Sequence, residues 1–296
     1  MTQILLTGRG SRPRWAGVAL GGATCVILCG FGGERPAALG ASALGLGDAA
    51  VATGAGTTAL YSNPAGMAHI RQHTFDLGFL REPTRTSLYT SSVDNTSEWG
   101  LAAGVGYSYD SDWTQDIGTR RGHDVRGGSA FGFVSEAGRL LFGASVGYLD
   151  VALPGRDVAG WSGDLGVAVG VSALRLGAVV RNAWRADKAV TPRRIAAGVG
   201  LVTGTFLAEA DGSWGMDAHS GAAYRVGGAV QFGEEGVQLR AGYRYVDGDH
   251  GVTGGVSWRT TQFSLDTGLA VDDPGGVTAV SGSIGLTFVV PYDVVP

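Results

Sequence analysis

The sequence contains few charged residues, few prolines and only two cysteines. Charged residues make up 16% of the chain, against about 25% in average soluble domains, so little is available to cover a water-facing surface. The 9 prolines exclude a collagen-like or proline-rich chain. Cys25 and Cys29 both lie near the N-terminus, so no disulfide framework holds the remainder together.

Long apolar runs are also missing after the first 33 residues. A membrane-spanning helix needs about 20 consecutive apolar residues, and no such run occurs there. The chain instead has 52 glycines and an ordinary hydrophobic share of 44%. This composition is typical of a transmembrane β-barrel, because its lipid-facing side chains occupy every second position and never form a run.

The first 33 residues have the pattern of a cleavable signal peptide for export. Arg9, Arg12 and Arg14 precede the apolar stretch 15–33, which ends before Glu34. Cleavage is expected between about residues 30 and 43, and a retained anchor helix is the alternative. The net charge of −4 argues against nucleic acid as a partner, because nucleic-acid binding requires a basic face.

From residue 74 to the C-terminus, the sequence alternates between apolar and small or polar residues. In the segment 163–171, for example, Leu165 and Val171 fall on one face and Asp164 on the other. The pattern predicts an all-β fold, an antiparallel transmembrane barrel of about fourteen strands. The predicted strands are 74–84, 86–93, 98–109, 127–136, 139–152, 162–172, 174–185, 194–203, 205–213, 223–233, 237–247, 250–260, 262–272 and 277–290.

The predicted connections alternate between short turns and longer polar loops. Short turns fall at 135–138, 172–173, 203–204, 233–236 and 260–261, and longer loops at 110–126, 153–161, 186–193, 214–222 and 273–276. Outer-membrane barrels have short periplasmic turns and longer external loops, whereas a soluble sandwich or propeller has no reason to alternate in this way. We therefore expect the protein in the outer membrane, in contact with lipid and lipopolysaccharide.

The ends of the predicted strands support the same interpretation. Aromatic residues gather there, as in the interface girdles of barrels; they are Tyr107, Tyr109, Tyr148, Trp184, Trp214, Tyr243, Tyr245, Trp258, Phe263 and Phe288. The segment 283–290 (SIGLTFVV) resembles the signal that the outer-membrane assembly machinery recognises in a last strand. That machinery is therefore an expected partner.

Residues 34–73 precede the barrel and are poor in charge. A fourteen-stranded barrel is too wide for its own side chains to fill, so this segment is predicted to be a helical plug at the periplasmic mouth; a mobile leader is the alternative. Helical turns are expected over 44–52, a break over 53–58, and a second turn that Asn63 caps and Pro64 begins. The plug motif comprises Tyr61, Asn63, Pro64, Ala65, Gly66 and Met67.

The plug carries a family resemblance. Residues 43–53 read ALGLGDAAVAT and residues 58–68 read TALYSNPAGMA. These stretches resemble the N-terminal signature of the FadL-type outer-membrane family, and are most similar to its PorV/PorQ branch. The resemblance implies a fourteen-stranded barrel with an N-terminal segment in its lumen. FadL-type members pass hydrophobic molecules, whereas PorV-type members hold or hand on partners for secretion or envelope machinery.

Charged residues on the inward parity of the strands are the remaining candidates for function. They are Arg181, Arg185, Glu209, Asp211, Arg240, Arg244 and Asp266. Arg240 and Arg244 are expected to reach Asp211 or Asp266, or to hold the plug. The set is interpreted first as a structural ladder that satisfies charge inside the barrel, and alternatively as a polar constriction that selects what passes.

The sequence predicts neither catalytic residues, nor a metal site, nor a cofactor. His69 and His73 have the spacing of two metal ligands on a helix, but no third ligand accompanies them, and no glycine-rich phosphate loop precedes a helix. The predicted function is a non-enzymatic barrel that anchors an envelope machinery of the secretion or motility type, with periplasmic or surface proteins as candidate partners. The alternative is a passive FadL-like channel for a small or hydrophobic solute.

Overall fold

The computed structural model describes residues 39–97, 100–114, 118–153, 155–185, 187, 190–217, 221–233, 235–273 and 278–291. The predicted signal peptide and the first residues of the predicted plug lie outside this set. Among the described residues, no helix is both long enough and apolar enough to cross a membrane.

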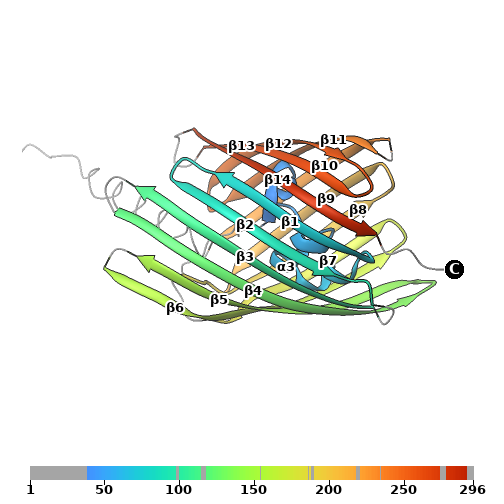
Figure 1. Cartoon of the computed structure of the whole chain (residues 1–296), viewed down its shortest axis with the longest axis horizontal. Helices are drawn as coiled ribbons and strands as arrows, with labels where there is room; N and C mark the ends of the chain where they lie inside the picture. The colour runs from blue at the N-terminus through green and yellow to red at the C-terminus, as the bar shows by residue number, and fades with distance from the viewer. Residues whose placement is uncertain are drawn as a thin grey trace, which may run out of the picture.

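Fourteen antiparallel strands close into one barrel, as the alternation predicts (Figure 1). Each strand pairs with its neighbours in the chain, and the last pairs with the first from Gln72↔Pro291 to Arg81↔Gly282. The strands are β1 (Gln72–Arg81), β2 (Arg85–Asp94), β3 (Leu101–Thr114), β4 (Gly118–Ser135), β5 (Gly138–Leu153), β6 (Arg156–Val171), β7 (Leu174–Trp184), β8 (Arg194–Val202), β9 (Phe206–Gly215), β10 (Ala222–Phe232), β11 (Gly236–Val246), β12 (Asp249–Arg259), β13 (Phe263–Asp272) and β14 (Ala279–Pro291).

The outer face of the barrel is apolar and the inner face is small or polar. On β1, Phe75, Leu77 and Phe79 are 41%, 50% and 37% exposed, whereas Thr74 and Asp76 between them are buried. On β6, Leu165 and Val171 face outward and Asp164 inward, as predicted. A membrane barrel has this inversion of the soluble pattern, because its solvent on the outside is lipid.

The barrel has two ends, which we call the turn end and the loop end. The turn end carries the connections from β2 to β3, β4 to β5, β6 to β7, β8 to β9, β10 to β11 and β12 to β13, together with the start of β1 and the end of β14. The loop end carries the other seven connections. Because periplasmic connections are the short ones in such barrels, we expect the turn end on the periplasmic side.

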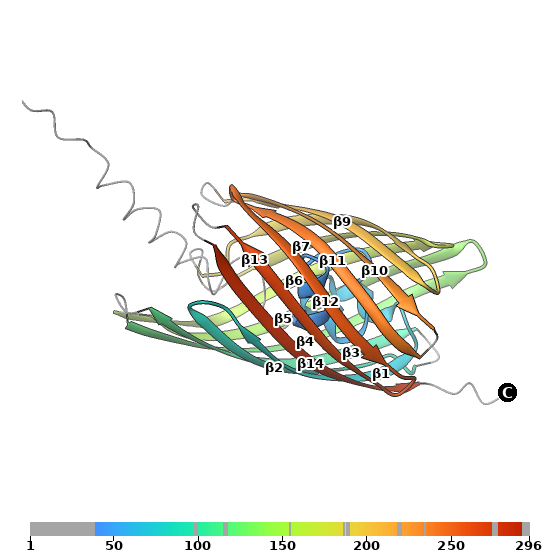
Figure 2. The same ribbon diagram turned by 90° about the horizontal axis from the view of Figure 1, so that it is seen from above.

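Two predicted external loops are wrong. Most of 110–126 and 153–161 is strand, since β3 extends to Thr114, β4 begins at Gly118, β5 ends at Leu153 and β6 begins at Arg156. The extensions project beyond the rim at the loop end (Figure 2). Their polar sequence hides the alternation, because a paired hairpin outside the lipid needs no apolar face.

Aromatic side chains form two groups on the outer surface. Near the loop end, the Tyr148 and Trp161 rings lie 5.1 Å apart and those of Trp214 and Tyr224 6.2 Å apart. Near the turn end, Trp258 and Phe263 lie 5.3 Å apart. Such groups are typical of the two lipid–water interfaces, with the apolar band between them.

A charge placed in the apolar band should destabilise the barrel. Val226 is 49% exposed near the middle of β10, and we expect Val226→Arg to lower the free energy of unfolding by about 2–4 kcal/mol. Urea unfolding of the protein refolded into lipid vesicles measures this change. The control is Gly204→Arg, which adds the same charge in a turn where a side chain meets no atom within 4 Å; an equal loss in both variants would contradict a lipid-facing Val226.

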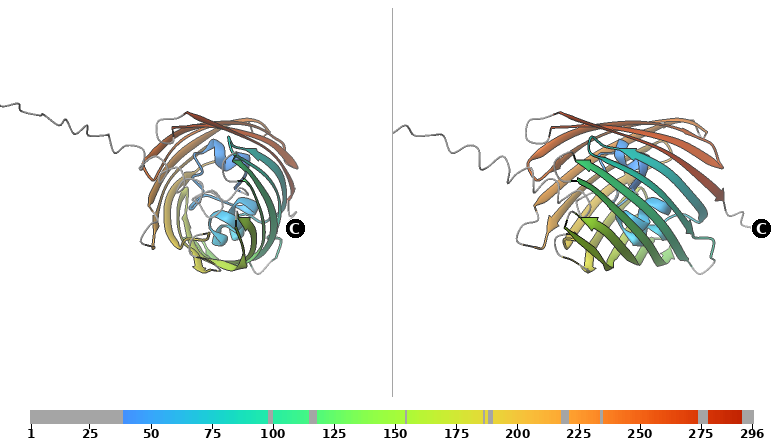
Figure 3. Two further views of the ribbon diagram at one scale, coloured as in Figure 1. Left: turned by 90° about the vertical axis from the view of Figure 1, so that its left-hand side faces the viewer. Right: turned by 60° about the vertical axis from the view of Figure 1, so that its left-hand side comes forward.

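The N-terminal segment lies inside the barrel (Figure 3). It contains two short helices, α2 (Gly40–Gly45) and α3 (Gly56–Ser62), and a 3₁₀ turn, η2 (Pro64–Ala68). The helical turns predicted up to residue 52 end early, because Gly47 and Asp48 adopt φ of 71° and 64°, which a right-handed helix does not include. The helix α3 begins at Gly56, within the predicted break over 53–58. We call residues 39–71 the plug.

Candidate functional site

The plug crosses the lumen deeper than the predicted mouth position. Its backbone meets inward-facing glycines several residues inside the turn end, and a side chain on them would collide with it. A Cβ on Gly143 would lie 2.3 Å from the Ala65 nitrogen, and one on Gly177 2.2 Å from the Val51 oxygen. The other glycines in such contact with the plug backbone are Gly227, Gly242 and Gly268.

Asn63 joins three parts of the structure at the predicted turn. Its side-chain oxygen accepts a hydrogen bond of 3.2 Å from the Ala65 N–H and so caps η2. Its amide nitrogen donates to the Val51 carbonyl at 2.9 Å and to the Val167 carbonyl of β6 at 3.1 Å. Pro64 follows as the first residue of η2, where its missing N–H costs nothing.

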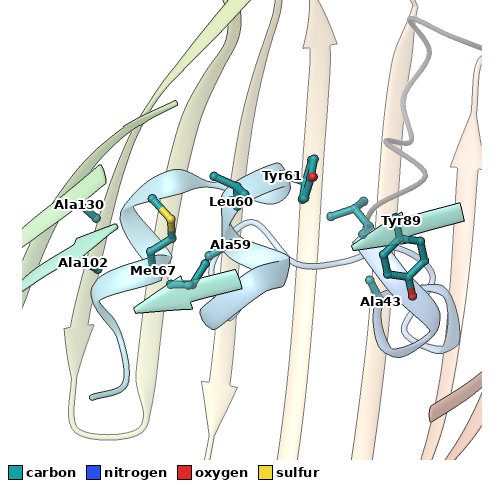
Figure 4. Packing of buried hydrophobic residues seen from close by; sticks show 10 residues of the cluster. Ala43, Ala59, Leu60, Tyr61, Met67, Tyr89, Ala102 and Ala130 are labelled. Atoms are coloured by element: carbon teal, nitrogen blue, oxygen red, sulfur yellow. The ribbon is translucent and has the colours of Figure 1, made fainter. Parts of the chain in front are cut away.

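The remaining residues of the plug motif pack against the wall. Leu60 and Met67 are fully buried in one cluster with Ala102 and Ala130 (Figure 4). The Tyr61 ring lies 5.8 Å from the guanidinium carbon of Arg126, within cation–π range. Ala65 and Gly66 are buried as well.

Glu209 and Asp211, neighbours on the inner face of β9, hold the middle of the plug. The Asp211 carboxylate accepts from the N–H groups of Ala50 and Val51 at 2.8 and 3.0 Å. The Glu209 carboxylate accepts from those of Ala52 and Thr53 at 2.6 and 3.2 Å, and from the Thr53 hydroxyl. Four successive backbone donors thus find acceptors on one strand.

The predicted lumenal arginines divide into three groups. Arg240 pairs with Asp266 along the wall. Arg244 pairs with Asp272 at 2.5 Å and also with Asp48 of the plug, rather than with Asp211. Arg181 donates to the Ser62 carbonyl at 3.2 Å. Arg181 and Arg244 therefore bond to the plug, whereas Arg240 bonds to Asp266 and its side chain lies beside Gly45 of the plug.

Arg185 is not part of the lumenal wall. It follows the end of β7, and its guanidinium binds the carboxylate of Asp217, two residues after the end of β9, with one contact of 3.0 Å. The strand was predicted one residue too long. In addition, β7 carries a bulge opposite Gly163 and Leu165, which breaks the simple inside–outside alternation on which the prediction relied.

Several lumenal charges were missed by the sequence analysis. Arg85 pairs with Asp110 at 2.9 Å, and Arg126 pairs with Asp164. Asp110 and Arg126 lie in the predicted loop 110–126, where no alternation indicates whether a side chain points into the lumen. Asp48 lay in the plug, where no periodicity indicates a partner.

Two cavities lie beside the plug in the turn-end half of the lumen. One has a volume of about 550 Å³ and lies beside α2, with Thr57, Asp76, Tyr89, Gln231 and Phe263 among its lining residues. The other has a volume of about 780 Å³ and lies beside the end of η2, with Asn95, Val134 and three arginines in its lining. Thr53, Ala55, Ile70 and Val202 line both.

His69 follows η2 as its C-terminal cap and lines the second cavity. Burial, followed by the charges of Arg175 and Arg139, lowers the pKa of His69 from 6.5 to about 4, while the carbonyl of Ala52 acts weakly in the opposite direction. The docked plug therefore favours neutral His69. A released plug regains the ordinary pKa, so docking is unaffected above pH 6.5 and weakens as the pH falls from 6.5 towards 4.

We expect acid to loosen the plug through His69. Between pH 7.5 and pH 5, the ratio of released to docked plug should rise roughly 25-fold more in the native protein than in a His69→Gln variant. Hydrogen–deuterium exchange of residues 59–68 at the two pH values measures this difference. Comparing the two proteins at each pH cancels the titration of lumenal carboxylates. An identical pH response in both would exclude His69 as the cause.

Solved structures of outer-membrane channels share this architecture. The CymD monoaromatic hydrocarbon channel matches with a TM-score of 0.65 at 15% identity, over 85% of this chain and 97% of that one. The toluene transporter TodX of P. putida matches at 0.59 and 14%, over 84% and 96%. A FadL homologue of Pseudomonas aeruginosa matches at 0.59 and 10%, over 86% and 98%. The fold is that of the FadL-type outer-membrane barrels.

The similar structures support the fold but not a closer family assignment. No protein-family model matches the chain, and no curated protein does. The PorV/PorQ branch therefore stays a prediction. The similar structures are channels rather than enzymes, which is consistent with the non-enzymatic prediction.

Proposed function

We propose that the protein is a passive outer-membrane channel for a small or hydrophobic solute. The solute passes through the lumen when the plug moves aside. The observation that carries the proposal is a plug that crosses the lumen with open space beside it. Its described contacts with the wall are non-covalent. They are close packing of its backbone over wall glycines and the hydrogen bonds of Asn63, Glu209 and Asp211. A segment held in this way is able to shift without unfolding the barrel.

The channel is favoured over the anchoring role that the sequence analysis put first. The similar structures are described as hydrocarbon channels or a toluene transporter, and nothing in the comparisons supports an envelope-machinery role. A channel also makes use of a displaceable plug, whereas an anchor needs only a sealed barrel.

Localisation and partners belong to the same proposal. We infer export through the signal peptide 1–33, insertion by the outer-membrane assembly machinery through β14, and contact with lipid and lipopolysaccharide. The apolar outer face, the two aromatic groups and the pairing of β14 with β1 support these inferences.

Flux through reconstituted protein tests the proposal. The native protein and a variant lacking residues 39–71 are each reconstituted into planar bilayers and compared for ion conductance. We expect low flux from the native barrel and at least tenfold more from the variant. The folded barrel is verified first by the shift in gel mobility on heating. Two folded but equally sealed barrels would overturn the channel and favour the anchor.

A further inference from the structure

The second cavity, at the turn end of the lumen, has an unusual charge. Its lining includes Arg71, Arg139 and Arg175, and among the described lining residues there is no aspartate or glutamate. This contrasts with the chain as a whole, in which 26 acidic residues exceed 22 basic ones. Elsewhere in the lumen, Arg85 and Arg240 are paired with aspartates, whereas no ion pair joins Arg139 or Arg175 to a described residue.

Two of these arginines are held side by side. Arg139 of β5 and Arg175 of β7 both stand opposite Gly170 of β6. A Cβ on Gly170 would lie 3.0 Å from the Arg139 side chain and 3.3 Å from that of Arg175, so both lean over the space that a glycine leaves open. Two like charges so placed repel each other, and an anion between them would offset that repulsion.

Within the described residues, both arginines bond only to neutral carbonyl groups. Arg139 donates to the carbonyl of His69, and Arg175 donates to those of Ser172 and Leu174 at 2.6 and 2.9 Å. Each guanidinium has five N–H donors, so most of them stay available to a ligand.

His69 adds a polar group to the same wall. Its side chain lines the cavity and the residue is only 8% exposed. Neither ring nitrogen meets hydrogen-bond geometry with any described residue. Buried polar groups normally have a partner, and the neutral imidazole has one N–H to donate.

We propose that this cavity is a binding site for a small dianion bearing phosphate or carboxylate oxygens, held by Arg139, Arg175 and His69. The guanidinium fork matches both kinds of oxyanion with paired, charge-assisted hydrogen bonds. Two adjacent guanidinium groups balance a double negative charge. The volume of about 780 Å³ is within the range of small-molecule sites.

The site goes beyond the proposed channel function, because binding at the turn end requires no transport. It also touches the plug, since Arg139 donates to the carbonyl of His69, the residue after η2. An anion bound there would lie between the plug and the wall, and so would bear on how the plug is held.

Titration of the full-length protein in detergent tests the proposal. Isothermal calorimetry is run with inorganic phosphate, with succinate, and with methylammonium as the cationic control. We expect saturable binding of at least one dianion and none of methylammonium. Arg139→Gln and Arg175→Gln should each weaken binding at least tenfold, and the corresponding lysine variants should weaken it less.

The matched control is Arg259→Gln, which removes one positive charge from the other cavity and should leave binding unchanged. The site would be overturned if neither dianion bound saturably at concentrations up to about 10 mM. It would also be overturned if Arg259→Gln lost as much binding as Arg139→Gln and Arg175→Gln. Folding of every variant is verified by its heat-dependent gel mobility. If the variant lacking residues 39–71 conducts but the full-length protein binds no dianion, only this inference is overturned. If the full-length protein binds a dianion but that variant stays sealed, only the channel proposal is overturned.

Discussion

Replacing Gly143 by valine should release the plug and open the barrel. A Cβ at this position would lie 2.3 Å from both the Ala65 nitrogen and the Pro64 carbonyl carbon. These are backbone atoms of η2 and have no flexible side chain that could move away. Valine is itself favourable in a strand, so the barrel should still form while the turn is pushed from the wall.

We expect the conductance of Gly143→Val to rise at least tenfold above that of the native protein. Hydrogen–deuterium exchange of residues 60–68 should become fast at the same time, since their protected docking site is lost. The control is Gly254→Val on the outer face of β12, where the nearest atom is the Arg240 oxygen at 3.8 Å. If η2 stays protected in Gly143→Val, the steric contact is not what positions the plug.

Removal of the two β9 carboxylates should release the middle of the plug. In a Glu209→Ala, Asp211→Ala double variant, the N–H groups of residues 50–53 lose their acceptors. A buried donor without a partner costs about 1–3 kcal/mol, and lumenal water will offset part of that cost. We expect conductance to rise at least tenfold.

Intermediate variants separate geometry from charge. Glu209→Gln with Asp211→Asn keeps an acceptor oxygen at each position and should give a smaller rise than the alanine pair. Glu136→Ala with Asp157→Ala removes the same two residue types from exposed positions and should leave conductance unchanged. Equal conductance in the alanine pair and in the native protein would show that these hydrogen bonds do not hold the plug.

The number of strands and their facing could be predicted because each is a local property. Alternation on a strand follows from the pleat, and lipid on one side demands apolar residues there, as at Leu165 and Val171. Strand ends were less predictable. The hairpins from β3 to β6 extend past the lipid, where no apolar face is required, and the β7 bulge displaced Arg185 from the expected wall.

The candidate site could be predicted only in its parts. The sequence of residues 59–70 indicated a capped turn, because Asn63 and Pro64 act on neighbouring backbone. It placed Glu209 and Asp211 on an inward face, because parity is local. It did not indicate that these carboxylates meet residues 50–53, more than 150 positions earlier.

By itself, then, the sequence determined a closed sheet of fourteen strands, its two faces, and a charge-poor segment available to fill it. Only the tertiary structure decided which wall glycines the plug packs against and which arginine pairs with Asp48. It also decided that Arg139 and Arg175 lie on either side of Gly170. The physical reason is that period-two alternation sets the side of the sheet on which a residue lies. Which inward residues face one another across the lumen depends instead on strand register and on the path of the plug, and both are set by contacts distant in the chain.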